Sequence, residues 1–190
     1  MAQALFISET ILKDRSLISD NVDIKYIRET TLYCQDVYIQ KLTGTTLFQL
    51  LITQITAGTL TNVNTTLLND YIQPILVWRV TAESAYWTSN KLMNKGVMNQ
   101  SSENSQSVSR SVLDAIANKA NDKAEYYEQR MIDYLCENST LYPTYDNPAS
   151  GVDVIHPNRG TAFTSSIHLE SSPRPKSMRA RYNDEQISLD

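Results

Sequence analysis

Histidine and cysteine supply many of the catalytic bases and metal ligands of proteins, and this chain has two of each. Both histidines, His156 and His168, lie near the C-terminal end among prolines, serines and glycines. A segment of that composition holds catalytic geometry less well than a helix or strand does. Neither histidine belongs to a His-Glu-x-x-His pattern. We therefore interpret both as surface or interface residues.

The two cysteines are predicted to be structural. Cys34 and Cys136 each fall within a helical pattern beside apolar neighbours. Two thiols alone cannot complete the four-ligand cage of a structural zinc site. We interpret both as buried free thiols, which favours synthesis in a reducing cytoplasm.

Glycines and carboxylates give no stronger signal for chemistry. Phosphate-binding loops need several glycines close together, because successive backbone amides must point at one anion, and the five glycines here are scattered singly. The carboxylates Glu125 and Glu128 lie among Lys123 and Arg130, as on a solvated helix face. The sequence therefore predicts no catalytic, cofactor-binding or metal-binding residues, and it favours a protein that is not an enzyme.

Composition and charge limit the kinds of partner that the chain is expected to bind. Of the 190 residues 41% are hydrophobic, and the net charge of -4 comes from interleaved acids and bases, so the whole chain has no strong attraction to nucleic acid or anionic membrane. No run of about 18 apolar residues predicts a membrane span. Packing in the core and between subunits explains the aromatic residues at helical spacing better than base stacking does: Tyr26, Tyr33, Tyr38, Tyr71, Trp78, Tyr86, Trp87, Tyr126, Tyr127 and Tyr134.

The sequence from Ser8 to Gly58 predicts three helices. Ser8 is an N-cap residue that can accept a backbone N–H at the start of a short helix. Apolar residues spaced by three and four predict a second helix over residues 23–42, which Gly44 ends. A third helix with a wide apolar face begins at Thr45 and ends before Gly58.

A long helical pattern follows, capped by Asn64 and running to Lys95. Pro74 lies inside it, and an interior proline removes a hydrogen bond at a cost of about 3 kcal/mol. We expect either a kink there or a new helical segment with Pro74 in its first turn. In both cases the helix changes direction near Gln73.

A second long helix is predicted over residues 108–142, after a polar loop at residues 96–106. The two long helices should fold back on each other, with the earlier helices packed against them. The predicted fold class is therefore all-α: a helical bundle with a long antiparallel helix hairpin, plus an extended C-terminal arm containing a short β-strand. Residues 1–142 form the helical domain and residues 143–190 the extended tail.

The tail carries the residues that we expect to dock on a subunit or partner. Apolar and polar residues alternate over residues 163–169, which predicts a strand that needs a neighbouring edge to pair with. The following run contains four bases and no acid; such a run is usually solvated, and contact with phosphate or an acidic protein is the alternative. The predicted docking residues are Phe163, Ile167, Leu169, Arg174, Lys176, Arg179 and Arg181.

The order of landmarks along the chain resembles that of bacteriophage head-to-tail connector proteins, the adaptor or portal-associated ring proteins of crAss-like and other Bacteroidetes phages. The landmarks cover most of the chain and are Leu5-Phe6-Ile7-Ser8, Tyr38-Ile39-Gln40 with Leu42, Gly44 and Thr45, Tyr71-Ile72-Gln73-Pro74, Gly96-Val97, Tyr134-Leu135 with Asn138, and Tyr142-Pro143.

That resemblance implies a structural virion protein, made in the host cytoplasm and incorporated at the head-to-tail junction. Its subunits would form a homo-oligomeric ring, commonly a dodecamer, beneath the portal protein, extend the DNA channel and meet further tail or ring proteins. Non-specific contact with packaged DNA is implied as well, whereas catalytic residues, cofactors and a membrane are not. A helical nucleic-acid-binding packaging or regulatory factor is the main alternative, followed by a cellular scaffolding protein and a helical-bundle enzyme without known motifs.

Overall fold

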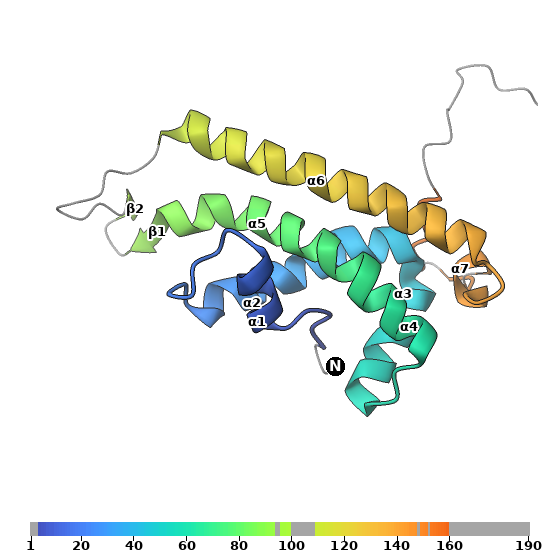
Figure 1. The fold of residues 1–190 in the computed structure, drawn as a ribbon. Coiled ribbons are helices and arrows are strands. Elements are labelled where there is room, and N and C mark those ends of the chain that lie inside the picture. Colours follow the sequence, from blue (N-terminus) through green and yellow to red (C-terminus); the bar gives the residue numbers. More distant parts are fainter. Residues whose placement is uncertain (1–3, 94–95, 100–108, 148, 152, 160–190) are drawn as a thin grey trace, which may run out of the picture. The chain divides into compact units, whose positions relative to one another are not determined.

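The computed structural model describes residues 4–93, 96–99, 109–147, 149–151 and 153–159. Residues 1–160 form one compact unit, and its described part is mainly helical (Figure 1). The all-α class and the helical bundle predicted from the sequence are therefore confirmed. The predicted strand of the C-terminal arm lies outside the described residues.

The first helix, α1 (Glu9–Arg15), begins as predicted. Ser8 has an extended backbone, and its side chain accepts a hydrogen bond from the Ile11 amide. Glu9 lies in the first turn and forms an ion pair with Lys13 at 2.7 Å, one helical turn later. A cap and an acid at the positive end of the helix dipole explain why so short a helix starts here.

The predicted helix over 23–42 is present, but a π-helical segment interrupts it. Asp23 caps α2 (Ile24–Cys34) by accepting from the Lys25 amide. The π-helical segment η1 (Gln35–Ile39) follows, and α3 (Gln40–Ala57) continues the same run of helix.

Two glycines shape α3, each at a positive φ. Gly44 has φ 77° and ψ 157°, so one helical stretch ends there and the next begins directly after it, as the sequence predicted. Gly58 has φ 66° and ψ 25°, and its amide reaches back to the carbonyls of the last turn, which is the left-handed C-cap that the sequence predicted.

The next helical run starts earlier than predicted. Thr61, not Asn64, is the N-cap of α4 (Asn62–Thr66), and Asn64 is buried inside that helix, where its side chain donates to Gln54. A π-helical segment, η2 (Leu67–Ile72), leads into α5, and Pro74 is the second residue of α5 (Gln73–Ser89). Helical backbone continues through Gln73, whose amide bonds to the Leu68 carbonyl, so the predicted break before Pro74 is absent and the π-helical segment lies just before the proline instead.

The prediction of helix to Lys95 was wrong. The chain leaves α5 after Ser89 and forms a two-stranded antiparallel hairpin from β1 (Asn90–Met93) and β2 (Gly96–Asn99), with Asn90 opposite Asn99. Short strands of mixed polarity give little periodicity, so the helical pattern of α5 was extended too far.

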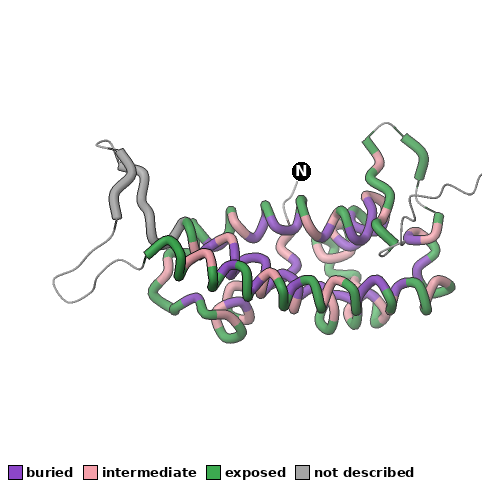
Figure 2. The backbone as a smooth tube through the Cα atoms, turned by 90° about the horizontal axis from the view of Figure 1, so that it is seen from above, coloured by how far each residue is buried: buried purple, intermediate pink, exposed green. Residues whose placement is uncertain are grey.

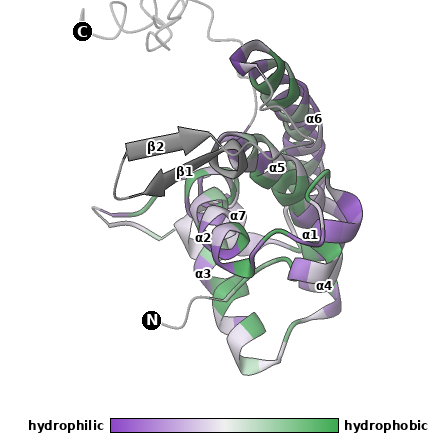
Figure 3. Cartoon of the chain, turned by 90° about the vertical axis from the view of Figure 1, so that its left-hand side faces the viewer, coloured by the Kyte–Doolittle hydropathy of each residue, from purple (hydrophilic) through white to green (hydrophobic). Residues whose placement is uncertain are grey.

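The long helix α6 (Arg110–Glu137) runs antiparallel to α5 and beside it, which confirms the predicted helix hairpin (Figure 1). In both Figure 1 and Figure 3, α5 lies between α6 and the helices α2 and α3. This central position explains why α5 is buried on most of its sides: Ile75, Leu76, Val77, Val80 and Ala82 are all buried.

The core fills the space between these layers, and buried residues recur along each long helix (Figure 2). At the α5–α6 contact the buried residues are small, with Ala82 facing Ala117 and Ala120, so the two helices approach closely. Of the two cysteines, Cys34 is buried as predicted, whereas Cys136 is exposed on α6, beside Tyr145.

Candidate functional site

The docking residues predicted from the sequence all lie outside the described residues. The structure therefore neither brings together nor separates Phe163, Ile167, Leu169, Arg174, Lys176, Arg179 and Arg181. Four other features of the described part bear on function: a C-terminal segment packed on α3, a groove beside α3, and two differently charged flanks of α6.

The first feature is the C-terminal strap, which we define as residues 143–159. It begins with a short helix, α7 (Pro143–Asp146), and the buried rings of Tyr142 and Tyr145 anchor it to the core. The Tyr142 hydroxyl donates to the Val63 carbonyl at 3.0 Å. The sequence placed this segment in the extended tail, whereas the structure packs it against the helices and includes it in the compact unit.

The strap completes the backbone hydrogen bonding of α3 at its break. In an uninterrupted helix the Thr45 amide would donate to the Lys41 carbonyl. Here the Thr45 amide donates to the Ile155 carbonyl at 3.0 Å, and the Lys41 carbonyl accepts from the Asn158 amide at 3.1 Å. The two groups that the break at Gly44 separates are thus both satisfied by the strap.

The end of the strap is tied back to its beginning by Arg159. Its Nη2 donates to the carbonyls of Tyr145 and Asp146, both at 2.7 Å, and lies 3.3 Å from the Asp146 carboxylate. The guanidinium also lies over the Tyr145 ring, 5.2 Å from its centroid. The strap is therefore a closed loop on the body of the protein.

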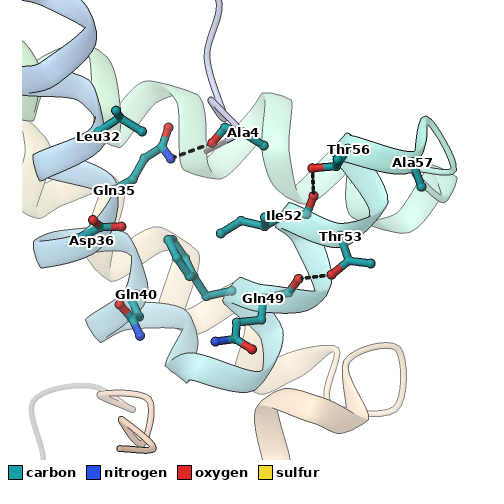
Figure 4. Close-up of a pocket in the computed structure, with 11 residues that line it drawn as sticks. Ala4, Leu32, Gln35, Asp36, Gln40, Gln49, Ile52, Thr53, Thr56 and Ala57 are labelled. Carbon is teal, nitrogen blue, oxygen red and sulfur yellow. Dashed lines mark hydrogen bonds between the residues drawn. The ribbon is translucent and has the colours of Figure 1, made fainter. Parts of the chain in front are cut away.

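The second feature is a groove between the α2–η1 run and α3, with a volume of about 710 Å³ (Figure 4). Leu32, Phe48 and Ile52 form its apolar wall, and the rim is polar. The hydroxyls of Thr53 and Thr56 donate to the carbonyls one turn earlier in α3, which leaves little free hydrogen-bonding capacity on that side. Such a groove suits apolar groups.

Two side chains of η1 define the polar end of the groove. Gln35 is buried; it accepts from the Phe6 amide at 2.8 Å and donates to the Ala4 carbonyl at 3.1 Å, so it holds the N-terminal segment against the helix. Asp36 is the titratable residue of the described lining, and partial burial raises the pKa of its carboxyl group above the usual value.

The third feature is the acidic flank of α6, where Glu125 and Glu128 lie near Glu83 of α5. One cation, Arg79, is nearly buried among them: Nε lies 2.7 Å from Glu128, and Nη1 donates to Asn121 at 2.7 Å. Burial by itself would lower the pKa of Arg79, but the hydrogen bond and charge of Glu128 raise it above its usual value. The guanidinium is therefore fixed in the charged form.

Tyr38 extends this cluster onto η1. Its ring stacks on Arg79, 4.4 Å from the guanidinium carbon, and its hydroxyl donates to Glu83 at 3.1 Å. Burial first and the bond to Glu83 second raise the pKa of Tyr38 to about 12. The bonds of Arg79 to Glu128 and Asn121, and of Tyr38 to Glu83, tie α5, α6 and η1 together.

The fourth feature is the basic–aromatic flank on the other side of α6. Lys123 Nζ lies 3.8 Å from the centroid of the Trp78 ring, and Arg130 lies 5.0 Å from that of Tyr71, both cation–π distances. A hollow of about 460 Å³ lies at the first of these pairs, lined by Trp78, Lys119, Asp122, Lys123, Tyr126 and Tyr127.

The sequence interpretation missed this flank, because it judged that the aromatics were not placed beside bases. Trp78 and Lys123 are far apart along the chain and meet only when α5 and α6 pack together. One signal was available in the sequence: Lys119, Lys123 and Arg130 are spaced by four and seven residues, so they share one face of a helix.

Among the residues that the structure describes, no group of three or more His, Cys, Asp or Glu side chains is placed to hold a metal ion. His156 is exposed in the strap, and His168 is outside the described part. The described helices include none that is both long and apolar enough to span a membrane.

Comparison with known proteins identifies one family. The model of a family of unknown function, DUF6712, matches residues 39–154, which is more than half of the chain. The match starts at the last residue of η1, includes all of α3 to α6, and ends in the strap just before Ile155 and Asn158, the residues that bond to α3 at its break. No curated protein and no solved structure matches the chain.

Proposed function

The chain belongs to the DUF6712 family, and because the function of that family is unknown, we propose one from the chain itself: it is a structural protein of a tailed-phage virion. Its copies form an oligomeric ring beneath the portal, which joins head to tail and extends the DNA channel. The resemblance to head-to-tail connectors suggests this function, and the surfaces of the described part support it.

The observation that carries the proposal is the set of large apolar side chains left exposed on regular helices. Tyr26, Tyr33 and Val37 are 45%, 51% and 41% exposed, and their spacing of seven and four residues puts them on one side of the α2–η1 run. Val112 and Ile116 are exposed in the same way on α6. Aligned apolar residues of this kind are typical of surfaces that pack against other proteins.

The proposed partners follow from the same reasoning. Copies of the chain occupy the exposed helix faces, and the portal protein and further tail or ring proteins bind the two ends of the ring. The arm from residue 161 onward, with Phe163, Ile167, Leu169 and its four basic residues, docks on a neighbour in the particle or meets packaged DNA. In this function the protein has no catalytic role, and it is located in the virion.

Negative-stain electron microscopy of the purified protein, with and without the portal protein of the same phage, tests the proposal. We expect rings, and rings attached to portals where both are present. A protein that stays monomeric at high concentration and does not bind the portal would contradict it.

A separate experiment, deletion of the arm, tests its role, and the packing of the strap shows where that deletion should begin. Because residues 143–159 pack on the body, the deletion should begin at residue 161 and not at residue 143, where the sequence predicted the tail to start. The shortened protein should unfold like the full chain but join particles less often. Equal incorporation of both forms into particles would remove the arm from the mechanism.

A nucleic-acid-binding packaging or regulatory factor remains the second candidate, and one observation favours it. The basic–aromatic flank offers Lys119, Lys123 and Arg130 beside exposed Tyr126, a combination that can hold a phosphate backbone and stack a base. A gel shift with single- and double-stranded DNA at two salt concentrations tests it; binding that weakens steeply with salt would support it.

A further inference from the structure

The outer surface of α6 carries one continuous stripe. Steps of four and three residues lead from Val112 to Ile116, Lys119, Lys123, Tyr126 and Arg130, so all six side chains share one face of the helix. All six are exposed, and Tyr126 is 67% exposed. The stripe is apolar at its N-terminal end and basic and aromatic towards its C-terminal end.

The line along which α6 packs on α5 separates this stripe from the acidic flank. Buried Ala117, Ala120 and Ala124 mark that line. Trp78 reaches the basic side of it, and Arg79, the next residue of α5, reaches the acidic side. Consecutive helical residues point about 100° apart, so the two flanks face different directions.

The acidic flank has an unbalanced charge. Glu128 and Glu125 lie near the Arg79 guanidinium, which donates to Glu128 and Asn121, and Glu83 joins the cluster through Tyr38 and Cys34. Glu125 is exposed. The apolar stripe of Tyr33 and Val37 lies beside this cluster, because these residues flank Cys34 and Tyr38, which face Glu83 and Arg79.

We propose that copies of the chain associate through these two flanks, with the basic–aromatic flank of one copy against the acidic flank of the next. The inference rests on the proposed ring and names the surfaces that form it. Such a contact is heterologous: each copy uses two different surfaces, so successive copies close into a ring if the rotation between them allows it.

Charge complementarity favours a second copy over nucleic acid as the occupant. The hollow on the basic side contains Asp122, and the whole chain has a net charge of -4, both unfavourable for a phosphate backbone. The acidic flank supplies a surface of opposite sign on the same molecule. Apolar contacts of Tyr126 with Tyr33 and Val37 would supply affinity, while the charges set the register and speed association.

Two charge-reversal variants test the pairing. Lys119→Glu with Lys123→Glu makes both flanks acidic. Asn118 precedes Glu125 by seven residues and so shares its face of α6. Asn118→Lys with Glu125→Lys makes both flanks basic, and it changes exposed residues while leaving the bond between Arg79 and Glu128 intact. We expect each variant alone to run as a monomer of about 21.5 kDa in analytical ultracentrifugation, and the two mixed in equal amounts to recover the mass of the wild-type oligomer.

A matched control is Lys25→Glu with Arg28→Glu, which reverses two exposed bases of α2 away from both flanks and should leave the oligomer unchanged. Circular dichroism checks that each variant is folded. If the Lys119→Glu, Lys123→Glu variant still forms an oligomer of the wild-type mass, the proposed pairing is wrong but the proposed ring is not. The same conclusion follows if both variants are monomeric and fail to associate when mixed. A wild-type chain that is monomeric with and without the portal would overturn the ring as well.

Discussion

At the scale of single residues, the two thiols show how strongly the exposure of a side chain depends on the helices that pack around it. Cys34 and Cys136 look alike in the sequence, each among apolar neighbours in a helix. Cys34 is buried where α2 meets Glu83 and Arg79 of α5, whereas Cys136 is exposed on α6 beside Tyr145. Which face of an amphipathic helix a borderline residue occupies depends on the partner helix, and no local pattern specifies that partner.

Thiol labelling checks this difference directly. In the native protein at neutral pH, a thiol reagent should modify Cys136 within minutes and leave Cys34 unmodified, and both should react in denaturant. A Cys136→Ser variant is the control and should show no fast-reacting thiol. Rapid native modification of Cys34 would mean that the α2–α5 junction opens readily.

Alkaline pH should destabilise the protein through the same junction. Burial raises the pKa of Cys34 from 9.0 to about 12, with the charge of Glu83 adding to the effect. A raised pKa of an acid favours the protonated folded state, so its contribution is complete below pH 9 and is lost as the pH rises towards 12. Urea unfolding at several pH values should show this loss, and Cys34→Ala should reduce its slope.

The prediction would fail if Cys34→Ala left the dependence between pH 9 and 12 unchanged. Tyr38 titrates in an overlapping range, since its pKa is raised from 10.0 to about 12. A Tyr38→Phe variant therefore serves as the second control, because it removes that hydroxyl and leaves the thiol.

At the scale of elements, the helix starts and stops were predictable where the signal is local. Ser8 and Gly58 were placed correctly, because an N-cap hydroxyl and a left-handed glycine act within a few residues. Gly44 was placed correctly as well, because one helical stretch ends there and the next begins directly after it. The strap was not predicted: it satisfies the hydrogen bonds of this break from 110 residues away. No pattern near Gly44 in the sequence predicts that contact.

Two glycine substitutions separate backbone strain from the strap contact. A Cβ at residue 44 would lie 2.8 Å from Pro157 Cδ and 3.2 Å from the Ile155 carbonyl, whereas a Cβ at residue 58 would meet nothing within 4 Å. We expect Gly44→Ala to lower the free energy of unfolding by about 3 kcal/mol or more and Gly58→Ala by about 1–2 kcal/mol. Equal effects in chemical denaturation would show that the strap adds nothing at Gly44.

At the scale of the whole molecule, the helical class, the long helix hairpin and much of the core followed from apolar periodicity. The C-terminal boundary of the compact unit did not follow from that periodicity. Prolines and glycines after residue 142 are typical of an extended tail, but Tyr145 is completely buried there. The α6 flanks were missed for a related reason: they consist of residues from two helices, and only the packing of α5 on α6 brings them together.

Truncation locates the edge of the compact unit. A chain ending at Gly160 should keep the stability of the full protein, because it retains the strap. A chain ending at Tyr142 loses the buried ring of Tyr145 and should be less stable by about 3 kcal/mol or more. Thermal unfolding of the two truncated proteins measures the difference, and similar melting temperatures would place the edge before α7.

The exchange of hydrogen bonds at Gly44 also limits when this part of the structure can form during synthesis of the chain. Thr45 and its partner Ile155 are 110 positions apart. While the chain is being synthesised, the ribosome releases the α3 segment long before the strap exists, and during that interval the amide of Thr45 and the carbonyl of Lys41 must bond to water or to each other. Until residues 155 and 158 have been made, the break at Gly44 therefore lacks the two hydrogen bonds that complete it in the finished chain.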